Sequence, residues 1–281
     1  MARRLQVTHR TGYRYAGPAS ISHNEARMTP RTTREQYVVS TRLDISPAAW
    51  AHSYVDYWGT AVTAFEITEP HERLDVTATS VVEVGDRLSD APGATWADLA
   101  DPGLCDRHVE YLATSGHTDS PTELRRIATD AARRTERPAD AVHAVLRRIR
   151  DRVEYQPGST GVHTAATAVW DARAGVCQDL VHLGLGALRS MGVPARYVSG
   201  YVMPRATGAV GEQQVGESHA WLQYWDGAWV SFDPTNDTTP SDLHVEVGVG
   251  RDYFDVAPLR GVYSGSSASE LFVEVELTIL A

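Results

Sequence analysis

The sequence predicts an α+β protein in which a β-rich N-terminal part precedes a mixed helical and β part. Residues 4–84 contain short runs of alternating apolar and polar residues that prolines and glycines interrupt, as in antiparallel sandwiches. From Pro121 onward, apolar residues recur at helical spacing instead. The segment between the two patterns is rich in Gly, Pro, Asp and Ser, as is typical of a connection. We therefore expect a β-sandwich-like domain at 1–90, a connection at 91–120 and a second domain at 121–281.

Six strands are expected in the N-terminal part. They cover residues 5–15, 21–28, 37–45, 51–57, 62–68 and 74–84. Four histidines are scattered over these strands without a recurring ligand spacing, so no metal site is expected.

Helical periodicity and turn residues divide the rest of the chain. Helices are predicted from Pro121 through Ala131 and over 139–153, 165–170 and 177–191, with a short helix near 104–113. A strand is expected at 195–203. The glycine-containing, polar residues 204–217 are expected to form a mobile flap.

The composition narrows the classes of function. A net charge of −10 argues against a nucleic-acid-binding surface. The sequence contains no apolar run of about 18 residues, so no transmembrane helix is expected. The basic N-terminus continues directly into an alternating segment without an apolar stretch, and this predicts a cytoplasmic protein without a signal peptide.

The basic residues and the cysteines have unusual counts. All 26 basic residues are arginine, which most simply reflects a GC-rich coding sequence. A functional alternative is that a chain without lysine cannot offer its own ε-amine as an acyl acceptor.

The two cysteines, Cys105 and Cys177, do not form a disulfide framework. Cys105 is expected to be a small core residue.

Cys177 stands where a helix is expected to begin. Gly175 provides a tight turn before it, and an apolar helical pattern follows and stops at Gly192. Unpaired N–H groups and the helix dipole at such a position stabilise a thiolate over a thiol. Cys177 is therefore a candidate nucleophile, although an isolated cysteine at a helix start is more often structural. A nucleophilic cysteine also requires a base and a group that orients the base.

His219 and Asp233 lie on two segments, 218–224 and 228–233, that resemble the strands of a hairpin. A two-residue turn at 226–227 places His219 opposite Pro234 and turns Asp233 to the other face. A three-residue loop at 225–227 places His219 directly opposite Asp233, with Cβ atoms about 5 Å apart.

We favour the three-residue loop because it also pairs Ala220, Leu222 and Tyr224 with Phe232, Val230 and Ala228 on one apolar face. It predicts a positive φ at Gly227. In this register Asp233 orients His219, and His219 accepts the thiol proton.

Several segments of the chain resemble the bacterial transglutaminase-like superfamily. In the second part they are Gly175-Val176-Cys177-Gln178-Asp179, residues 195–201, Ser218-His219-Ala220-Trp221, Asp233-Pro234-Thr235-Asn236, Gly250-Arg251-Asp252-Tyr253 and residues 258–261. In the first part, His9-Arg10-Thr11, residues 56–59 and Pro70-His71 resemble the β-rich region that precedes the core in one bacterial branch. That branch usually has Asn at the position of Thr60.

The resemblance implies a papain-like, transglutaminase-like catalytic core with Cys177 as nucleophile, His219 as base and Asp233 as orienting acid. Papain-type proteases match less well, because they carry Asn as the third residue. The Cys177 N–H is the expected first oxyanion donor, and the second is the Tyr155 hydroxyl or the Gln178 amide. Asp179 and His182 are expected to support the helix by hydrogen bonding.

The expected reaction is attack on an amide carbonyl through a thioester, without a cofactor or a metal. The expected partner is a peptide or protein amide substrate, with an amine acceptor if the acyl group is transferred, and neither nucleic acid nor membrane. Hydrolysis is favoured, because bacterial members of the family are often regarded as peptidases. The alternatives are transglutaminase-type transfer to an amine and a non-catalytic binding or scaffold module.

Overall fold

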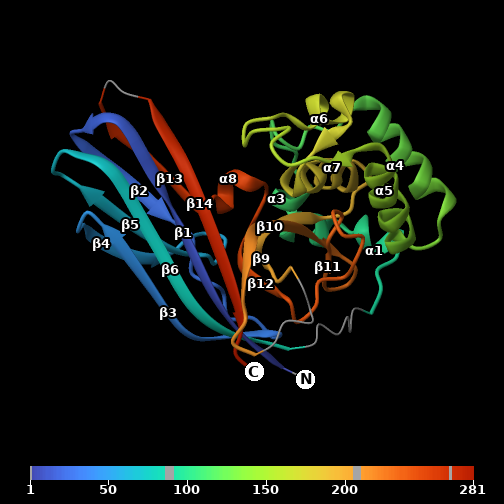
Figure 1. The fold of residues 1–281 in the computed structure, drawn as a ribbon. Helices are drawn as coiled ribbons and strands as arrows, with labels where there is room; N and C mark the ends of the chain where they lie inside the picture. The colour runs from blue at the N-terminus through green and yellow to red at the C-terminus, as the bar shows by residue number, and fades with distance from the viewer. Residues whose placement is uncertain (1, 86–91, 205–209, 266–267) are drawn as a thin grey trace.

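The computed structural model describes residues 2–85, 92–204, 210–265 and 268–281. Two layers of antiparallel strands lie beside a group of helices (Figure 1). This arrangement confirms the predicted α+β class. In the part of the chain that the structure describes, every helix is too short or too polar to cross a membrane.

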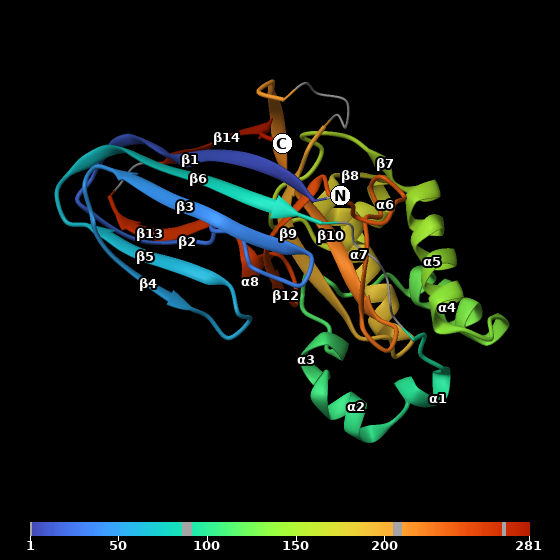
Figure 2. The same cartoon turned by 90° about the horizontal axis from the view of Figure 1, so that it is seen from below.

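The N-terminal strands form a sandwich of two sheets. Figure 2 shows β1, β6 and β3 in one layer and β2, β5 and β4 in the other. Every second residue near the end of β6 is buried, as the alternating sequence predicts. The strands are β1 (Arg3–Ala19), β2 (Ile21–Ala26), β3 (Gln36–Ser46), β4 (Trp50–Val55), β5 (Ala61–Ile67) and β6 (His71–Val84), and they confirm the six expected strands.

The larger sheet continues from the sandwich into the second part of the molecule. Its strand order is β12-β9-β10-β14-β1-β6-β3, and β11 pairs with β10. The additional strands are β9 (Ala195–Val202), β10 (Gln213–Trp225), β11 (Trp229–Phe232), β12 (His244–Gly250), β13 (Leu259–Ser264) and β14 (Ser269–Ile279). One continuous sheet therefore connects the candidate catalytic region to the sandwich.

The last two strands return to the N-terminal part. β14 pairs with β1 on one side and with β10 on the other, whereas β13 pairs with β2 in the smaller sheet. The predicted domain at 121–281 included both strands. Their pairing instead joins residues 259–279 to the predicted N-terminal domain.

Eight helices occur among the described residues. The predicted connection contains three short helices. His108 interrupts the helical run expected near 104–113 and divides it into α2 and α3, and α1 was not predicted. The helices are α1 (Trp96–Leu99), α2 (Pro102–Arg107), α3 (Val109–Leu112), α4 (Thr122–Arg134), α5 (Pro138–Arg152), α6 (Ala166–Ala172), α7 (Cys177–Ser190) and α8 (Tyr253–Val256).

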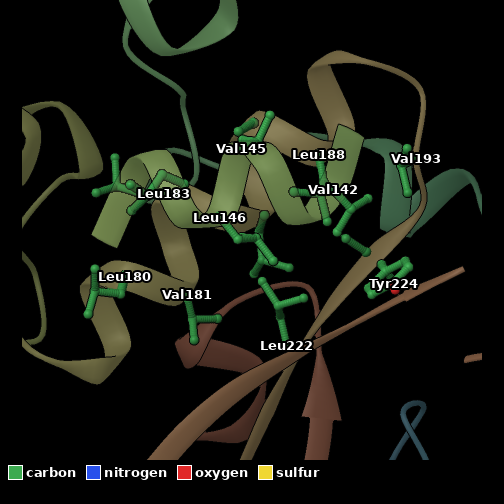
Figure 3. Close-up of a cluster of buried hydrophobic side chains, with 14 of the residues drawn as sticks. Val142, Val145, Leu146, Leu180, Val181, Leu183, Leu188, Val193, Leu222 and Tyr224 are labelled. Carbon is green, nitrogen blue, oxygen red and sulfur yellow. The ribbon is translucent and has the colours of Figure 1, made fainter. Parts of the chain in front are cut away.

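Helix α7 is the centre of the second part. Its side chains pack between α5 and β10, where Leu146, Val181 and Leu222 are almost completely buried (Figure 3). A Cβ atom at Gly184 would lie 2.8 Å from Leu222, and one at Gly186 would lie 2.2 Å from the Thr118 carbonyl oxygen. The two glycines therefore permit the close approach that holds the helix against its neighbours.

The β10–β11 hairpin has a three-residue loop, but the predicted position of that loop is wrong. Trp225 pairs with Trp229, so the loop consists of residues 226–228 and not 225–227. The two tryptophan rings contact each other edge to face at 5.5 Å, a favourable cross-strand pair. The Asp226 carboxylate also accepts a hydrogen bond from the Ala94 N–H at 2.6 Å. These contacts outside the predicted pattern set the loop position.

The predicted cross-strand pairs are each displaced by two positions, whereas the predicted faces of the hairpin survive this correction. Phe232 pairs with Leu222, two residues from the predicted partner Ala220. A shift of two residues keeps every side chain on its predicted face, because the side-chain period of a strand is two. Gly227 has φ of 81°, which confirms the predicted positive value.

The predicted flap at 204–217 is wrong in its second half. Residues from Gln213 onward belong to β10, and residues 213–216 pair with β14. Residues 205–209 lie outside the described part of the chain.

Candidate active site

Cys177 is the first residue of α7 and is partly buried. Two short parallel strands, β7 (Glu154–Tyr155) and β8 (Ala174–Gly175), lead the chain to this position. A Cβ at Gly175 would lie within 3.0 Å of the Asp179 and Val169 side chains. Glycine is therefore required for the tight turn immediately before the helix.

The N-terminus of α7 leaves the Cys177 N–H outside the helical hydrogen-bond ladder. The ladder begins at Asp179 and Leu180, whose N–H groups both donate to the Val176 carbonyl oxygen. N–H groups that precede the ladder are unpaired within the helix and form the positive end of its dipole. Both effects favour negative charge on a sulfur or an oxygen at Cys177.

The prediction that His219 lies directly opposite Asp233 is wrong by two positions in the observed register, but the two side chains are on the same face and still meet. The His219 Nε2 donates to the Asp233 Oδ2 at 2.7 Å, and the Asp233 side chain is completely buried. This bond leaves the Nδ1 of His219 available to the Cys177 sulfur, which is close enough to help raise the pKa of the imidazole. The structure thus brings together the three residues that the sequence proposed as nucleophile, base and orienting acid.

The electrostatics of the pair favour charged partners. Burial alone would lower the pKa of His219, but hydrogen bonds with Asp233 and Cys177 outweigh it and raise the pKa to about 10. Burial alone would raise the pKa of Asp233, but the hydrogen bonds from His219 and Asn236 and the nearby His244 ring outweigh it and hold the pKa well below its usual value. The expected state at neutral pH is an imidazolium between a carboxylate and the sulfur.

Asp233 has further donors around it. The Asn236 side-chain amide donates to its Oδ2 at 2.7 Å, and the Thr235 N–H donates to its Oδ1 at 2.9 Å. The His244 Nε2 lies 3.6 Å from the Asp233 Oδ2. The Ser241 N–H donates to the His244 Nδ1, so the proton of a neutral His244 ring is on Nε2 and faces the carboxylate.

Sequence reasoning did not assign roles to Asn236 and His244. Asn236 belongs to the segment 233–236 that carried the resemblance, and its position three residues after Asp233 in a turn could have indicated the contact. His244 is on β12 beyond a loop, and no local pattern links it to Asp233.

Tyr155 lies at the candidate site because β7 pairs with β8. The Tyr155 backbone is opposite Gly175. Its ring lines a cavity of about 400 Å³ together with Glu217, His219 and Asn236. Burial and the nearby Cys177, Glu217 and Asp233 raise the pKa of Tyr155 to about 12, so the side chain is a neutral hydroxyl donor at neutral pH.

Gln178 lies next to Cys177, but its side chain is used elsewhere. One of its amide N–H groups donates to the Val162 carbonyl oxygen at 3.2 Å. Of the two predicted candidates for a second oxyanion donor, Tyr155 is the one that lines the cavity beside His219.

Asp179 and His182 bond to the backbone around α7. The Asp179 carboxylate accepts from the Val176 N–H at 2.8 Å and from the Thr160 hydroxyl at 2.5 Å. Burial is the largest effect on Asp179, and its pKa is raised. The His182 Nε2 accepts from the Tyr253 N–H at 3.2 Å. Burial lowers the pKa of His182 to about 4, so the ring is neutral and links α7 to α8.

Comparisons with known proteins agree with this arrangement. Residues 5–83 match the bacterial transglutaminase-like N-terminal region, and residues 125–234 match the transglutaminase-like superfamily. An uncharacterized protein of Mycobacterium leprae is 45% identical over 99% of each chain. A protein-glutamine gamma-glutamyltransferase of Pseudomonas aeruginosa is 28% identical over 56% of this chain and 24% of that protein.

A solved structure has the same fold over the whole chain. The crystal structure of a proposed cysteine protease from Cytophaga hutchinsonii superposes with a TM-score of 0.79 at 24% sequence identity, and the match covers 100% of this chain and 92% of that one. The predicted transglutaminase-like core is therefore confirmed, and the matches support cysteine-based enzyme chemistry in general. Together with the full-length relative, they show that this chain belongs to the transglutaminase-like superfamily.

Proposed function

We propose that this protein hydrolyses a peptide or isopeptide amide through a thioester on Cys177, with His219 and Asp233 as its acid–base pair. The observation that carries this proposal is the 2.7 Å hydrogen bond between His219 and buried Asp233, on the ring whose pKa the nearby Cys177 also helps to raise. A nucleophile, a base and an orienting acid in this order are the minimum set for acyl transfer through a cysteine.

The first half-reaction forms the acyl-enzyme. The Cys177 thiolate attacks the amide carbonyl carbon, and a carbon–sulfur bond forms while the carbonyl oxygen gains negative charge. The His219 Nδ1–H then protonates the amide nitrogen, the carbon–nitrogen bond breaks, and the amine leaves. Asp233 holds the ring through Nε2 and stabilises its positive charge before the proton transfer.

The second half-reaction releases the product. His219, now neutral, accepts a proton from water, and the hydroxide oxygen attacks the thioester carbon. The carbon–sulfur bond breaks, the carboxylic acid leaves, and the thiolate–imidazolium pair is restored. In both halves the oxyanion accepts from the Cys177 N–H, and we assign the Tyr155 hydroxyl as its second donor.

The exposure of the cavity supports water as the acceptor. Val215 is 84% exposed and Tyr155 is 42% exposed at the cavity that reaches His219. Transfer to an amine at high yield requires that water be excluded from the thioester. The solved structure that shares the fold is also of a proposed protease.

Two other functions remain as alternatives. The partial relative from Pseudomonas aeruginosa is a glutamyltransferase, which favours transfer of a glutamine acyl group to an amine. The other alternative is a non-catalytic scaffold, in which the buried charges would have only a structural role.

One experiment separates the three functions. Wild-type protein, Cys177→Ala and the control Cys105→Ala are incubated with a glutamine-containing peptide library, with and without a primary amine, and the products are identified by mass spectrometry. Free acids formed by the wild type and by Cys105→Ala support hydrolysis, whereas amide products support transfer. If neither product forms and iodoacetamide labels Cys177 no faster than Cys105, the scaffold function is favoured.

A further inference from the structure

Glu217 places a carboxylate in the cavity beside His219. Both residues are on β10, two positions apart, and both line the same cavity of about 400 Å³. Residues two apart on a strand point to the same face and are separated by about 7 Å along it. The distance is the length of a short alkyl segment, so one substrate group can contact both side chains.

Among the residues that the structure describes, the Glu217 carboxylate has no cationic partner. It lines the cavity together with Tyr155 and contributes to the raised pKa of the Tyr155 hydroxyl. Within the described ranges, arginines pair with other acids, for example Arg3 with Asp242 and Arg31 with Glu246, and none forms an ion pair with Glu217. The carboxylate can therefore bind an external cation without first breaking an ion pair.

The location of Glu217 identifies the side of the substrate that it contacts. In the proposed mechanism the leaving amine must reach the Nδ1 of His219 to receive its proton. The same site receives an attacking amine in the reverse direction. Glu217 therefore lies beside the amine portion of the substrate and not beside its acyl portion, provided that the proposed function holds.

We propose that Glu217 selects substrates whose amine portion carries a second, positively charged group, such as a basic peptide segment or an alkyl diamine. The net charge of −10 favours the approach of such substrates. The chain contains no lysine, so it has no ε-amine of its own to compete for this site.

The test compares two amines that differ in one group. 4-Nitrophenyl acetate acylates the enzyme, and the burst of 4-nitrophenol measures the acyl-enzyme that depends on Cys177. Water then competes for the acyl-enzyme with one of two amines, 1,5-diaminopentane or 5-aminopentan-1-ol. In the second amine a hydroxyl replaces the second ammonium. Mass spectrometry of the acetyl products gives the rate constant for transfer to the diamine and that for transfer to the amino alcohol. Their ratio is corrected by a factor of two, because the diamine has two reactive amines.

The wild type should prefer the diamine by about five-fold, the effect of one solvent-accessible ion pair. Glu217→Gln should bring the ratio close to one, and Glu217→Asp should retain part of the preference. Glu154→Gln is the matched control, because Glu154 is exposed on β7 beside Tyr155 and does not line the cavity. It should keep the wild-type ratio.

Each failure has its own signature. A normal burst with no preference in the wild type overturns the role of Glu217 alone. Equal slowing of both amines in Glu217→Gln, with the ratio unchanged, means that Glu217 only positions Tyr155 and also overturns the inference. Absence of a burst that requires Cys177 contradicts the proposed function, and the selectivity inference fails with it.

Discussion

Replacing Asp233 with asparagine removes the charge that holds the His219 imidazolium and changes the side-chain shape very little. Asp233 is completely buried and lies 2.7 Å from the His219 Nε2. A hydrogen bond to a charged group contributes about 1.5–3 kcal/mol. The amide oxygen of asparagine can still accept a hydrogen bond from a neutral His219 ring. We therefore expect the substitution to remove this contribution of about 1.5–3 kcal/mol from the state with a charged His219 and to leave the neutral state almost unchanged.

The loss should appear in the reactivity of the thiol. A change of about 1.5–3 kcal/mol lowers the equilibrium constant that favours the thiolate–imidazolium pair over the neutral pair by about 10- to 150-fold. The second-order rate of Cys177 alkylation by iodoacetamide at pH 7, measured in a Cys105→Ser background, should fall by at most this factor. NMR titration of His219 should show its pKa below the value of about 10 in the parent protein.

The same substitution at Asp237 is the matched control. Asp237 is four positions along the chain, where its carboxylate pairs with Arg150 on the surface at 3.0 Å. Asp237→Asn should alkylate at the parent rate, because exposed pairs contribute little. If Asp233→Asn folds normally and alkylates as fast as the parent, Asp233 does not maintain the charged pair and our account of the site is wrong.

Three further predictions concern stability. Gly186→Ala should lower the free energy of unfolding in urea by about 1–3 kcal/mol, because its Cβ would lie 2.2 Å from a carbonyl oxygen. Gly116→Ala is the control, because Gly116 has open space around it, and it should leave this free energy unchanged. Equal values for the two variants would contradict the packing argument. The pKa of His182 is lowered to about 4, so its contribution to stability is present above pH 6.5 and is lost as the pH falls towards 4. His182→Gln should therefore reduce the slope of unfolding free energy against pH in that window by about 1.4 kcal/mol per pH unit, and an unchanged slope would show that His182 is not buried as a neutral ring. The pKa of His219 is raised to about 10, so its contribution to the free energy of unfolding is complete below pH 6.5 and is lost as the pH rises through 10. Urea titrations from pH 6 to 10.5 should show this loss in the parent protein and not in His219→Gln.

The strands β1 to β6 and β9 to β11, the helices α4 to α7 and the three candidate catalytic residues could be predicted because each depends on local pattern. The strands β12, β13 and β14 and the short helices α1 and α8 were not predicted. The start of α7 at Cys177 follows from the glycine turn and the helical periodicity. The face shared by His219 and Asp233 follows from strand periodicity, which is unaffected by a shift of two residues. The exact loop position could not be predicted, because it depends on the bond between Asp226 and Ala94, which are 132 positions apart.

Other features of the candidate site depend on long-range contacts and left no local signal. His244 lies near Asp233 only because β12 pairs with β9 at the edge of the larger sheet. Gln178 was a reasonable candidate oxyanion donor from its position beside Cys177, and only the structure shows that one N–H of its side-chain amide donates to the Val162 carbonyl oxygen. The return of β13 and β14 to the N-terminal strands also depends on pairings across most of the chain.

The position of β14 between β1 and β10 has a consequence for how the protein folds. Leu5 pairs with Ile279, so β1 pairs with a strand that is synthesised about 260 residues later. Pairing over such a separation slows folding. Until β14 is made, β1 lacks one neighbour and the β10 segment at 213–216 lacks its partner. The Cys177 region is therefore synthesised before its supporting sheet is complete, and full reactivity of the thiol is expected only after β14 has joined the sheet.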